Sequence, residues 1–83
     1  MEKSIGTITH YFSHLGVAVM DVTSELRVGD EIHILGHITD FTQRIASMEI
    51  EHKKVEVVGP GTEVALKVEE YVRKGDDVFK VIE

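Results

Sequence analysis

The stretch Leu26-Arg27-Val28-Gly29-Asp30-Glu31-Ile32-His33-Ile34-Leu35 decides the fold, because its pattern returns as Val72-Arg73-Lys74-Gly75-Asp76-Asp77-Val78-Phe79-Lys80-Val81. Each copy reads apolar residue, Arg, any residue, Gly, Asp, acid and then a β-branched residue. Gly adopts the positive φ of a tight turn, Asp hydrogen-bonds nearby backbone, and the β-branched residue favours an extended strand. Two such units in 83 residues predict a small all-β domain.

Length and composition limit what the chain can do. Its 83 residues predict a single domain, residues 1–83, with a thin core. The sequence contains neither GxGxxG nor GxxxxGK[ST], so we expect no GTP binding by this chain and no nucleotide cofactor. The net charge of −6 repels a polyanion such as duplex DNA, and no DNA partner is expected.

The cellular setting is predicted from what the sequence lacks. The start, Met1-Glu2-Lys3-Ser4, has no apolar run of the kind found in signal peptides, and no later segment approaches the length of a membrane span. The absence of cysteine argues against a disulfide-stapled secreted domain. We therefore expect a cytoplasmic protein with no membrane partner.

Alternation of apolar and polar residues marks the expected strands. Val64, Leu66 and Val68 are spaced by two, which favours a strand over a helix between Glu63 and Lys74. Gly59-Pro60-Gly61 is the strongest turn signal. The expected strands are Ile5–Phe12 and Val17–Met20 as a hairpin through residues 13–15, Ile32–Leu35, His37–Ile50 with a bend or bulge near residues 46–47, Lys54–Val58, Val64–Val68 and Val78–Ile82. Connections this short predict a small closed antiparallel β-barrel of six to seven strands.

The histidines do not predict a metal site. His10 and His14, and again His33 and His37, are four residues apart, which in a strand separates them by about 13 Å. That distance is too long for one ion. A cross-strand pair of His37 with His52 stays open, and a small metal-binding protein is a third alternative. No nucleophile, base and orienting acid recur at a recognisable spacing, so we expect no enzyme activity and no cofactor.

The order of several motifs resembles a known family. These motifs are Gly16-Val17-Ala18-Val19, the first repeated turn, Ser47-Met48, Gly59-Pro60-Gly61 and Gly75-Asp76. Together they resemble the second domain of the translation GTPases, the β-barrel that follows the G domain in elongation factor Tu and initiation factor 2, and stand-alone elongation-factor-like proteins. The barrel also resembles the C-terminal module of some collagenase-like peptidases.

The translation-factor resemblance implies a binding surface for RNA. By its motif positions, Val28 would offer an apolar wall to a base and Glu49 would accept hydrogen bonds from a ribose or base. By their grouping along the sequence, His52-Lys53-Lys54 and Arg44 on the preceding strand could form a small positive face for single-stranded RNA. The main prediction is thus a non-catalytic module that binds the tRNA acceptor end, rRNA or a translation-related protein.

A second function class stays open. The acidic loops could steer a basic protein partner, which would make the chain a protein-interaction or oligomerisation barrel that is accessory to a separate enzyme. These loops contain Glu25, Asp30, Glu31, Asp76 and Asp77.

Overall fold

Two turns of the same construction organise the fold. Gly29 and Gly75 both have φ of 96°. In each turn the Asp that follows, Asp30 or Asp76, accepts a hydrogen bond at Oδ2 from the backbone N–H of the Arg three residues earlier, at 2.9 Å. The same Asp donates its backbone N–H to the carbonyl of that Arg, at 3.1 and 3.0 Å. The predicted turn is confirmed in both copies.

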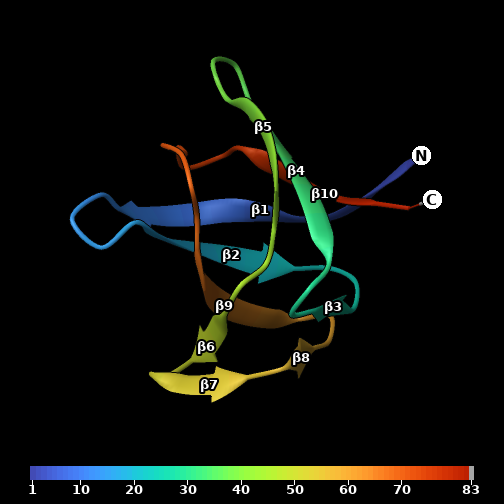
Figure 1. Cartoon of the computed structure of the whole chain (residues 1–83), viewed down its shortest axis with the longest axis vertical. Coiled ribbons are helices and arrows are strands. Elements are labelled where there is room, and N and C mark those ends of the chain that lie inside the picture. Colours follow the sequence, from blue (N-terminus) through green and yellow to red (C-terminus); the bar gives the residue numbers. More distant parts are fainter. Residues whose placement is uncertain (83) are drawn as a thin grey trace.

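The computed structural model describes residues 1–82, in which all regular elements are strands (Figure 1). The ten strands are β1 Glu2–Phe12, β2 Val17–Val22, β3 Leu26–Arg27, β4 Glu31–Leu35, β5 Asp40–Arg44, β6 Met48–Ile50, β7 Lys53–Val55, β8 Val57–Val58, β9 Thr62–Lys67 and β10 Asp77–Val81. Eight of them form an antiparallel sheet in the order β5-β4-β10-β1-β2-β9-β6-β7, and β3 pairs with β8. Within these residues there is no helix of the length and apolarity that a membrane span requires.

Each repeated turn is seated on an isoleucine, with which it exchanges two backbone hydrogen bonds: Ile45, directly after β5, for the first turn and Ile8, in β1, for the second. Gly29 donates its N–H to the carbonyl of Ile45 at 2.8 Å, and Ile45 donates back to Asp30 at 2.9 Å. The second copy repeats this exchange, because the N–H of the second turn glycine lies 2.8 Å from the carbonyl of Ile8, whose own N–H lies 2.8 Å from the carbonyl of Asp76. The two turns therefore satisfy their backbone groups in the same way.

The strands that follow the two turns pair with each other. In the ladder between β4 and β10, His33 lies opposite Phe79, with Ile34 opposite Val78 on one side and Ile32 opposite Lys80 on the other. The two copies are 46 positions apart in the sequence, so Ile32 of β4 corresponds to Val78 of β10 and Ile34 corresponds to Lys80. The pair Ile34–Val78 therefore corresponds to the pair Lys80–Ile32. The two copies of the sequence repeat are therefore related by a local twofold axis between β4 and β10.

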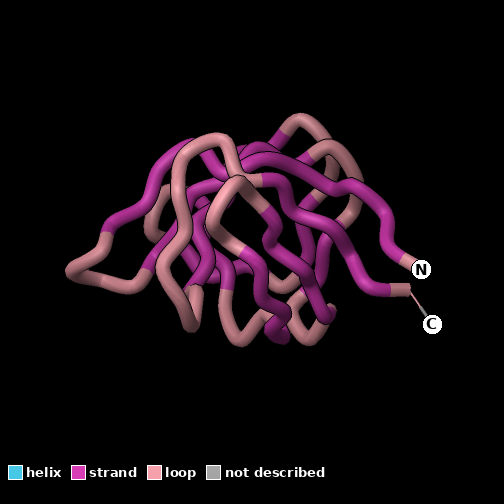
Figure 2. Tube along the Cα trace, turned by 90° about the horizontal axis from the view of Figure 1, so that it is seen from above, coloured by secondary structure: helices cyan, strands magenta, loops and turns pink. Residues whose placement is uncertain are grey.

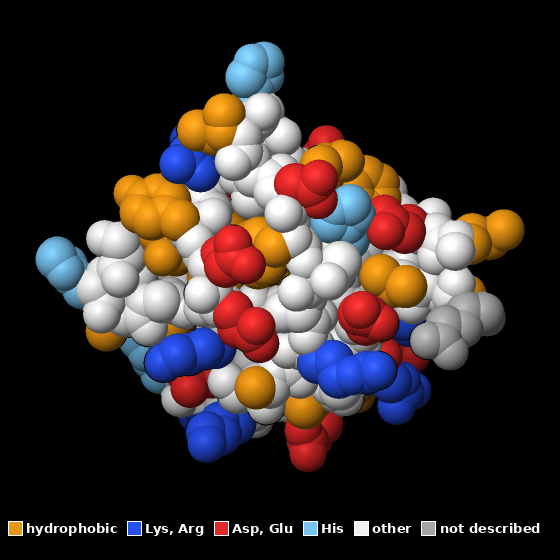
Figure 3. Space-filling model, turned by 45° about the horizontal axis from the view of Figure 1, so that its top comes forward, with side chains coloured by type: hydrophobic (Ala, Val, Ile, Leu, Met, Phe, Trp, Pro, Cys, Tyr) orange, Lys and Arg blue, Asp and Glu red, His pale blue; other side chains and the backbone are white. Residues whose placement is uncertain are grey.

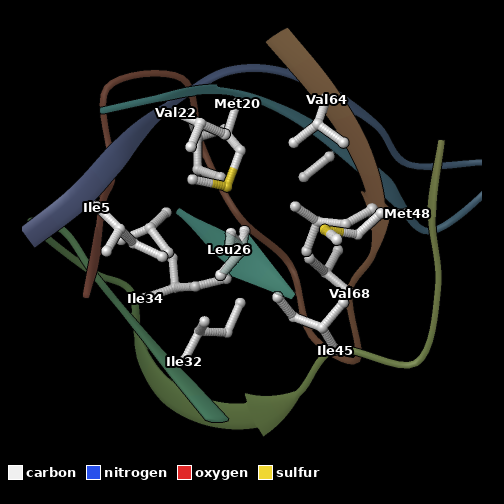
Figure 4. Close-up of a cluster of buried hydrophobic side chains, with 14 of the residues drawn as sticks. Ile5, Met20, Val22, Leu26, Ile32, Ile34, Ile45, Met48, Val64 and Val68 are labelled. Atoms are coloured by element: carbon white, nitrogen blue, oxygen red, sulfur yellow. The ribbon is translucent and has the colours of Figure 1, made fainter. Parts of the chain in front are cut away.

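The strands wrap around one core of apolar side chains, and Figure 2 shows the curled trace of the backbone from above. Side chains from both repeat copies meet there, and Leu26, Ile32 and Ile34 are fully buried (Figure 4). The other buried apolar residues are Ile5, Ile8, Ala18, Met20, Val22, Phe41, Ile45, Met48, Val58, Val64, Leu66, Val68, Val72 and Val78. Their alternation along β2, β4 and β9 is the period of a half-buried strand.

The sheet curls without closing through backbone pairing, which corrects the expected closed barrel of six or seven strands. The all-β, antiparallel part of that prediction is confirmed. In residues 1–82 the edge strands are β5 and β7. After β5 the chain turns away at residues 45–47, so that Met48 of β6 pairs with Leu66 of β9. The buried Gln43 side chain links β5 to the end of β9. Its Nε2 donates to Lys67 O at 2.9 Å, and its Oε1 accepts from Glu69 N at 2.8 Å.

Most of the expected strand positions are confirmed. The long run from His37 to Ile50 breaks at residues 45–47, and β9 is a strand rather than a helix. The expected strand Lys54–Val58 is instead divided, because β7 pairs with β6 whereas β8 pairs with β3. Two bulges in β1, between Ser4 and Gly6 and between Ile8 and His10, were not predicted.

Candidate functional site

Two adjoining hollows lie on the outer side of β2, β6 and β9. The larger has a volume of about 730 Å³ and the smaller about 300 Å³. Both are lined by Leu15, Val17, Glu49 and Ala65, so they form one continuous depression, which we call the β2–β9 groove. The larger hollow is also lined by Phe12, Val19, Ile50, Glu51, His52, Thr62, Glu63 and Val64, and the smaller by Ser47, Leu66 and Lys67.

The floor of the groove is apolar because β2 carries apolar residues on both of its faces. Ala18 and Met20 point into the core, so Val17 and Val19 point outward by the pleat. Across the sheet, Val19 lies opposite Ala65, and Ala65 lies opposite Glu49. The centre of the floor is thus formed by half-buried small apolar side chains.

Two turns form the walls of the groove. The β1–β2 hairpin provides Phe12, which is 50 % exposed and stacks on His10 with ring centroids 6.4 Å apart, and Leu15, which is 63 % exposed. On the other side, Glu51 and His52 make the β6–β7 turn with φ of 50° and 68°. Large exposed apolar side chains beside a hollow are typical of interaction sites.

One end of the groove is acidic. Glu51 and Glu63 line it, and Asp21 lies directly opposite Glu63 in the β2–β9 ladder. Glu49 lines both hollows and lies opposite Lys54 of β7. Like charges in directly opposed positions destabilise a sheet. The only hydrogen bond to the Glu63 carboxylate among residues 1–82 comes from the hydroxyl of Thr9, at 3.4 Å. Lys67 lines the other end of the groove. Acidic side chains are also spread over the face of the molecule shown in Figure 3.

A second cluster of ionisable groups surrounds His33. Its Nδ1 lies 2.9 Å from both carboxylate oxygens of Glu2, and its Nε2 lies 2.5 Å from Oδ1 of Asp40. These two hydrogen bonds, with Glu2 contributing more than Asp40, raise the pKa of the His33 imidazole above its ordinary value of 6.5. When it is protonated, the ring donates both N–H groups and so links the start of β1 and the start of β5 to β4.

The His33 cluster is not arranged for catalysis or metal binding. A histidine base or metal ligand needs one ring nitrogen with a free lone pair, whereas both nitrogens of His33 face carboxylates. In residues 1–82 no three or more His, Asp or Glu side chains are placed to hold a metal ion. His37 lies in the β4–β5 loop and His52 in the β6–β7 turn, which belong to opposite ends of the sheet order, so they do not form the cross-strand pair left open above.

The structure separates the predicted binding residues into two groups. Val28 is half-buried against the core, and its N–H donates to Glu56 O at 3.0 Å. Arg44 is exposed at the end of β5 and donates from Nη1 to Gly29 O at 3.1 Å. These two residues therefore support the first repeated turn.

Of the remaining candidates, only Glu49 lines the groove. Lys53 and Lys54 are exposed on β7, where they lie opposite Ile50 and Glu49 respectively. The structure thus brings Glu49, Lys53 and Lys54 together on one hairpin.

Most of the groove was missed from the sequence. Its walls and acidic end are assembled by the register of β2, β9 and β6, which depends on contacts between distant residues. One signal was present. The run Val17-Ala18-Val19-Met20 is apolar at every position, so the face of this strand that points away from the core also carries apolar side chains. Read in that way, the run predicts an outer apolar patch.

Comparison with known proteins gives relatives of one kind. The chain is 34 % identical over 76 residues to a protein of Methanocaldococcus jannaschii named as an uncharacterized protease, covering 90 % of this chain and 19 % of that protein. It is 36 % identical over 78 residues to a collagenase of Porphyromonas gingivalis, covering 92 % and 22 %. The chain thus spans about a fifth of the length of these relatives. No family model matches the chain.

Among solved structures, the fold matches the C-terminal domain of a putative U32 peptidase from Geobacillus thermoleovorans. The TM-score is 0.90 at 24 % identity, covering 96 % of this chain and 93 % of that one. The selenomethionine variant of the same domain matches with a TM-score of 0.87. These matches establish the likeness of fold.

The comparisons overturn the expected translation-factor identity. The prediction of an elongation-factor-like, RNA-binding module is wrong, because the similar proteins are named as proteases and a peptidase domain. The motifs that suggested it are mostly turns, and positive-φ glycines such as Gly29, Gly61 and Gly75 meet a need common to many small antiparallel domains. The lesser resemblance, to the C-terminal module of collagenase-like peptidases, agrees with the comparisons.

Proposed function

We propose that this chain is a non-catalytic accessory domain that binds protein in the service of a protease. The observation that carries this proposal is the match of nearly the whole chain to a fifth of two proteins named as a protease and a collagenase. The same chain also aligns with 93 % of a solved C-terminal domain, which supports a module separate from the remaining four-fifths of the relatives, where their catalytic groups would lie.

The side chains of the domain support binding rather than catalysis. The most strongly interacting histidine, His33, has both ring nitrogens committed to Glu2 and Asp40. The β2–β9 groove, by contrast, presents exposed apolar side chains to a partner. We further propose that the Gln43 bridge makes the curled sheet act mechanically as a closed barrel, so that it presents this groove on a rigid support.

The test is a domain replacement in the Porphyromonas gingivalis collagenase. Its matched segment of 78 residues is deleted in one variant and replaced by this chain in another. Cleavage of collagen and of a short chromogenic peptide is then measured for both. An accessory binding domain contributes to the long substrate only, so deletion should reduce collagen cleavage at least fivefold and leave cleavage of the short peptide within twofold.

The replacement variant should recover most of the lost collagen cleavage. A matched control carries the Gly29→Val form of this chain, whose first turn is strained by a β-branched residue at φ of 96°, and it should recover less collagen cleavage. Equal collagen cleavage by the deletion variant and the intact collagenase would refute the accessory role. Hydrolysis of either substrate by the isolated chain would refute the non-catalytic one.

A further inference from the structure

We infer that the β2–β9 groove binds an extended polypeptide segment in which a Lys or Arg side chain and an apolar side chain point the same way. This inference rests on the proposed function as a protein-binding domain and names the chemistry of the partner. The groove occupies the outer side of β2, β6 and β9, away from the His33 cluster.

The size of the groove fits a segment rather than a folded partner. Its larger hollow, about 730 Å³, falls within the range of about 300–1,000 Å³ found for sites of drug-sized ligands. A stable interface between folded proteins uses roughly 20–30 residues on each side, whereas 15 residues line the two hollows of the groove together. An extended strand of four or five residues matches the available space better than a second domain.

The apolar part of the groove supplies a contact for one anchoring side chain. Val19 and Ala65 form a shallow floor, and Phe12 and Leu15 stand beside it with half or more of their surface exposed. Covering Phe12 and Leu15 removes apolar surface from water, which is the main driving force for association. A Leu, Ile or Met side chain of the partner would fit between the hairpin and the floor.

The charges select a basic neighbour for that anchor. Asp21 and Glu63 face each other across β2 and β9, and Glu49 and Glu51 line the same groove. A guanidinium or ammonium group placed beside Glu63 would relieve the repulsion of the opposed pair. A Lys or Arg of the partner would therefore offset the charge of the opposed Asp21 and Glu63 carboxylates, whereas Glu49 already lies opposite Lys54.

The opposite charges at the two ends of the groove also fix the spacing of the partner's side chains. Glu63 and Lys67 lie in the same strand, β9, four residues and thus about 13 Å apart. An extended segment repeats its side-chain direction every two residues. It can therefore direct a basic residue toward Glu63, an apolar residue two positions on toward Ala65, and an acidic residue two further on toward Lys67.

The inference is tested with the probe peptide Arg-Thr-Leu-Thr-Glu, acetylated and amidated, titrated into the ¹⁵N-labelled chain at 0.15 M salt. Amide shifts should concentrate in β2, β9 and the β1–β2 hairpin and should saturate. Two comparison peptides, Glu-Thr-Leu-Thr-Glu and Arg-Thr-Ser-Thr-Glu, should each bind at least fivefold more weakly. Shifts that are spread over the whole chain, or that are equal for the three peptides, would refute the inference.

Paired variants distinguish binding in the groove from non-specific electrostatic and hydrophobic binding elsewhere on the surface. Glu63→Lys should weaken binding of the probe about fivefold, whereas Glu70→Lys, the same charge change at an exposed site outside the groove, should alter it less than twofold. Leu15→Asp should weaken it likewise, and Ile38→Asp, at a residue 70 % exposed in the β4–β5 loop, should not. Dispersed amide spectra of all four variants establish that they are folded, and equal loss within either pair would overturn the assignment.

The two proposals fail in different ways. If the probe does not bind but the domain replacement restores collagen cleavage, the accessory role stands and the groove assignment is wrong. If the probe binds in the groove but the replacement does not restore cleavage, the binding chemistry stands and the link to a protease is wrong.

Discussion

The two turn glycines allow a prediction in which backbone strain is separated from side-chain packing. Gly29 and Gly75 share φ of 96°, and a Cβ added at either would meet no atom within 4 Å. Gly59 offers the same open space without a positive φ. Replacing each in turn by Ala therefore changes the backbone energy at two sites and leaves Gly59→Ala as the matched control.

The expected magnitude follows from the φ values. An L-residue in the left-handed region costs roughly 1–2 kcal/mol. We therefore expect Gly29→Ala and Gly75→Ala each to lower the free energy of unfolding by about 1–2 kcal/mol, and by similar amounts because the two turns are built alike. Gly59→Ala should raise it by roughly 0.4–1 kcal/mol, because the new side chain restricts mainly the unfolded chain.

Urea unfolding followed by circular dichroism measures these differences. With a slope near 1 kcal/mol per M, the two turn variants should lose about 1–2 M in the unfolding midpoint. Melting should shift in the same direction, by about 4–8 °C for each kcal/mol. If Gly29→Ala or Gly75→Ala is as stable as Gly59→Ala, the positive φ does not carry the turn and the reasoning fails.

Two further predictions concern the cluster and the bridge described above. The folded-state pKa of His33 lies above its unfolded value of 6.5. Its stabilising contribution is therefore complete below pH 6.5 and is lost as pH rises through the folded-state pKa. Urea unfolding measured at a series of pH values should show this decline in stability, and His33→Gln should abolish the decline. Gln43→Leu leaves Lys67 O and Glu69 N without their side-chain partner, which should cost roughly 1–3 kcal/mol and speed hydrogen exchange at the Glu69 amide at least tenfold, and unchanged exchange there would contradict the bridge.

The strands and turns were predictable because their signals are local. Gly29 and Asp30 specify a turn with their immediate neighbours, and the alternation in β9 specifies a strand without reference to the rest of the chain. The link that the Gln43 side chain makes between β5 and β9 was not predictable in this way. Gln43 and Lys67 are 24 positions apart in the sequence, and the residues next to Gln43 do not indicate that its side chain will contact Lys67.

The candidate site depended even more on distant contacts. His33 meets Glu2 from 31 positions away, and the acidic end of the groove exists only because Asp21 and Glu63 fall in register. The same locality explains the wrong family. Turn motifs report how a small sheet reverses direction, a need that unrelated proteins share, so their order along the chain is weak evidence of descent.

The equivalence of the two turns creates an ambiguity that the chain must resolve during folding. Either turn, seated on Ile8 or on Ile45, would make the same pair of backbone hydrogen bonds. The two seats differ in their surroundings. Ile8 lies in β1, which has bulges between Ser4 and Gly6 and between Ile8 and His10, whereas Ile45 directly follows β5, which pairs with β4 in unbroken register. The bulges in β1 therefore give the two seats different backbone geometry, although both turns make the same pair of backbone hydrogen bonds.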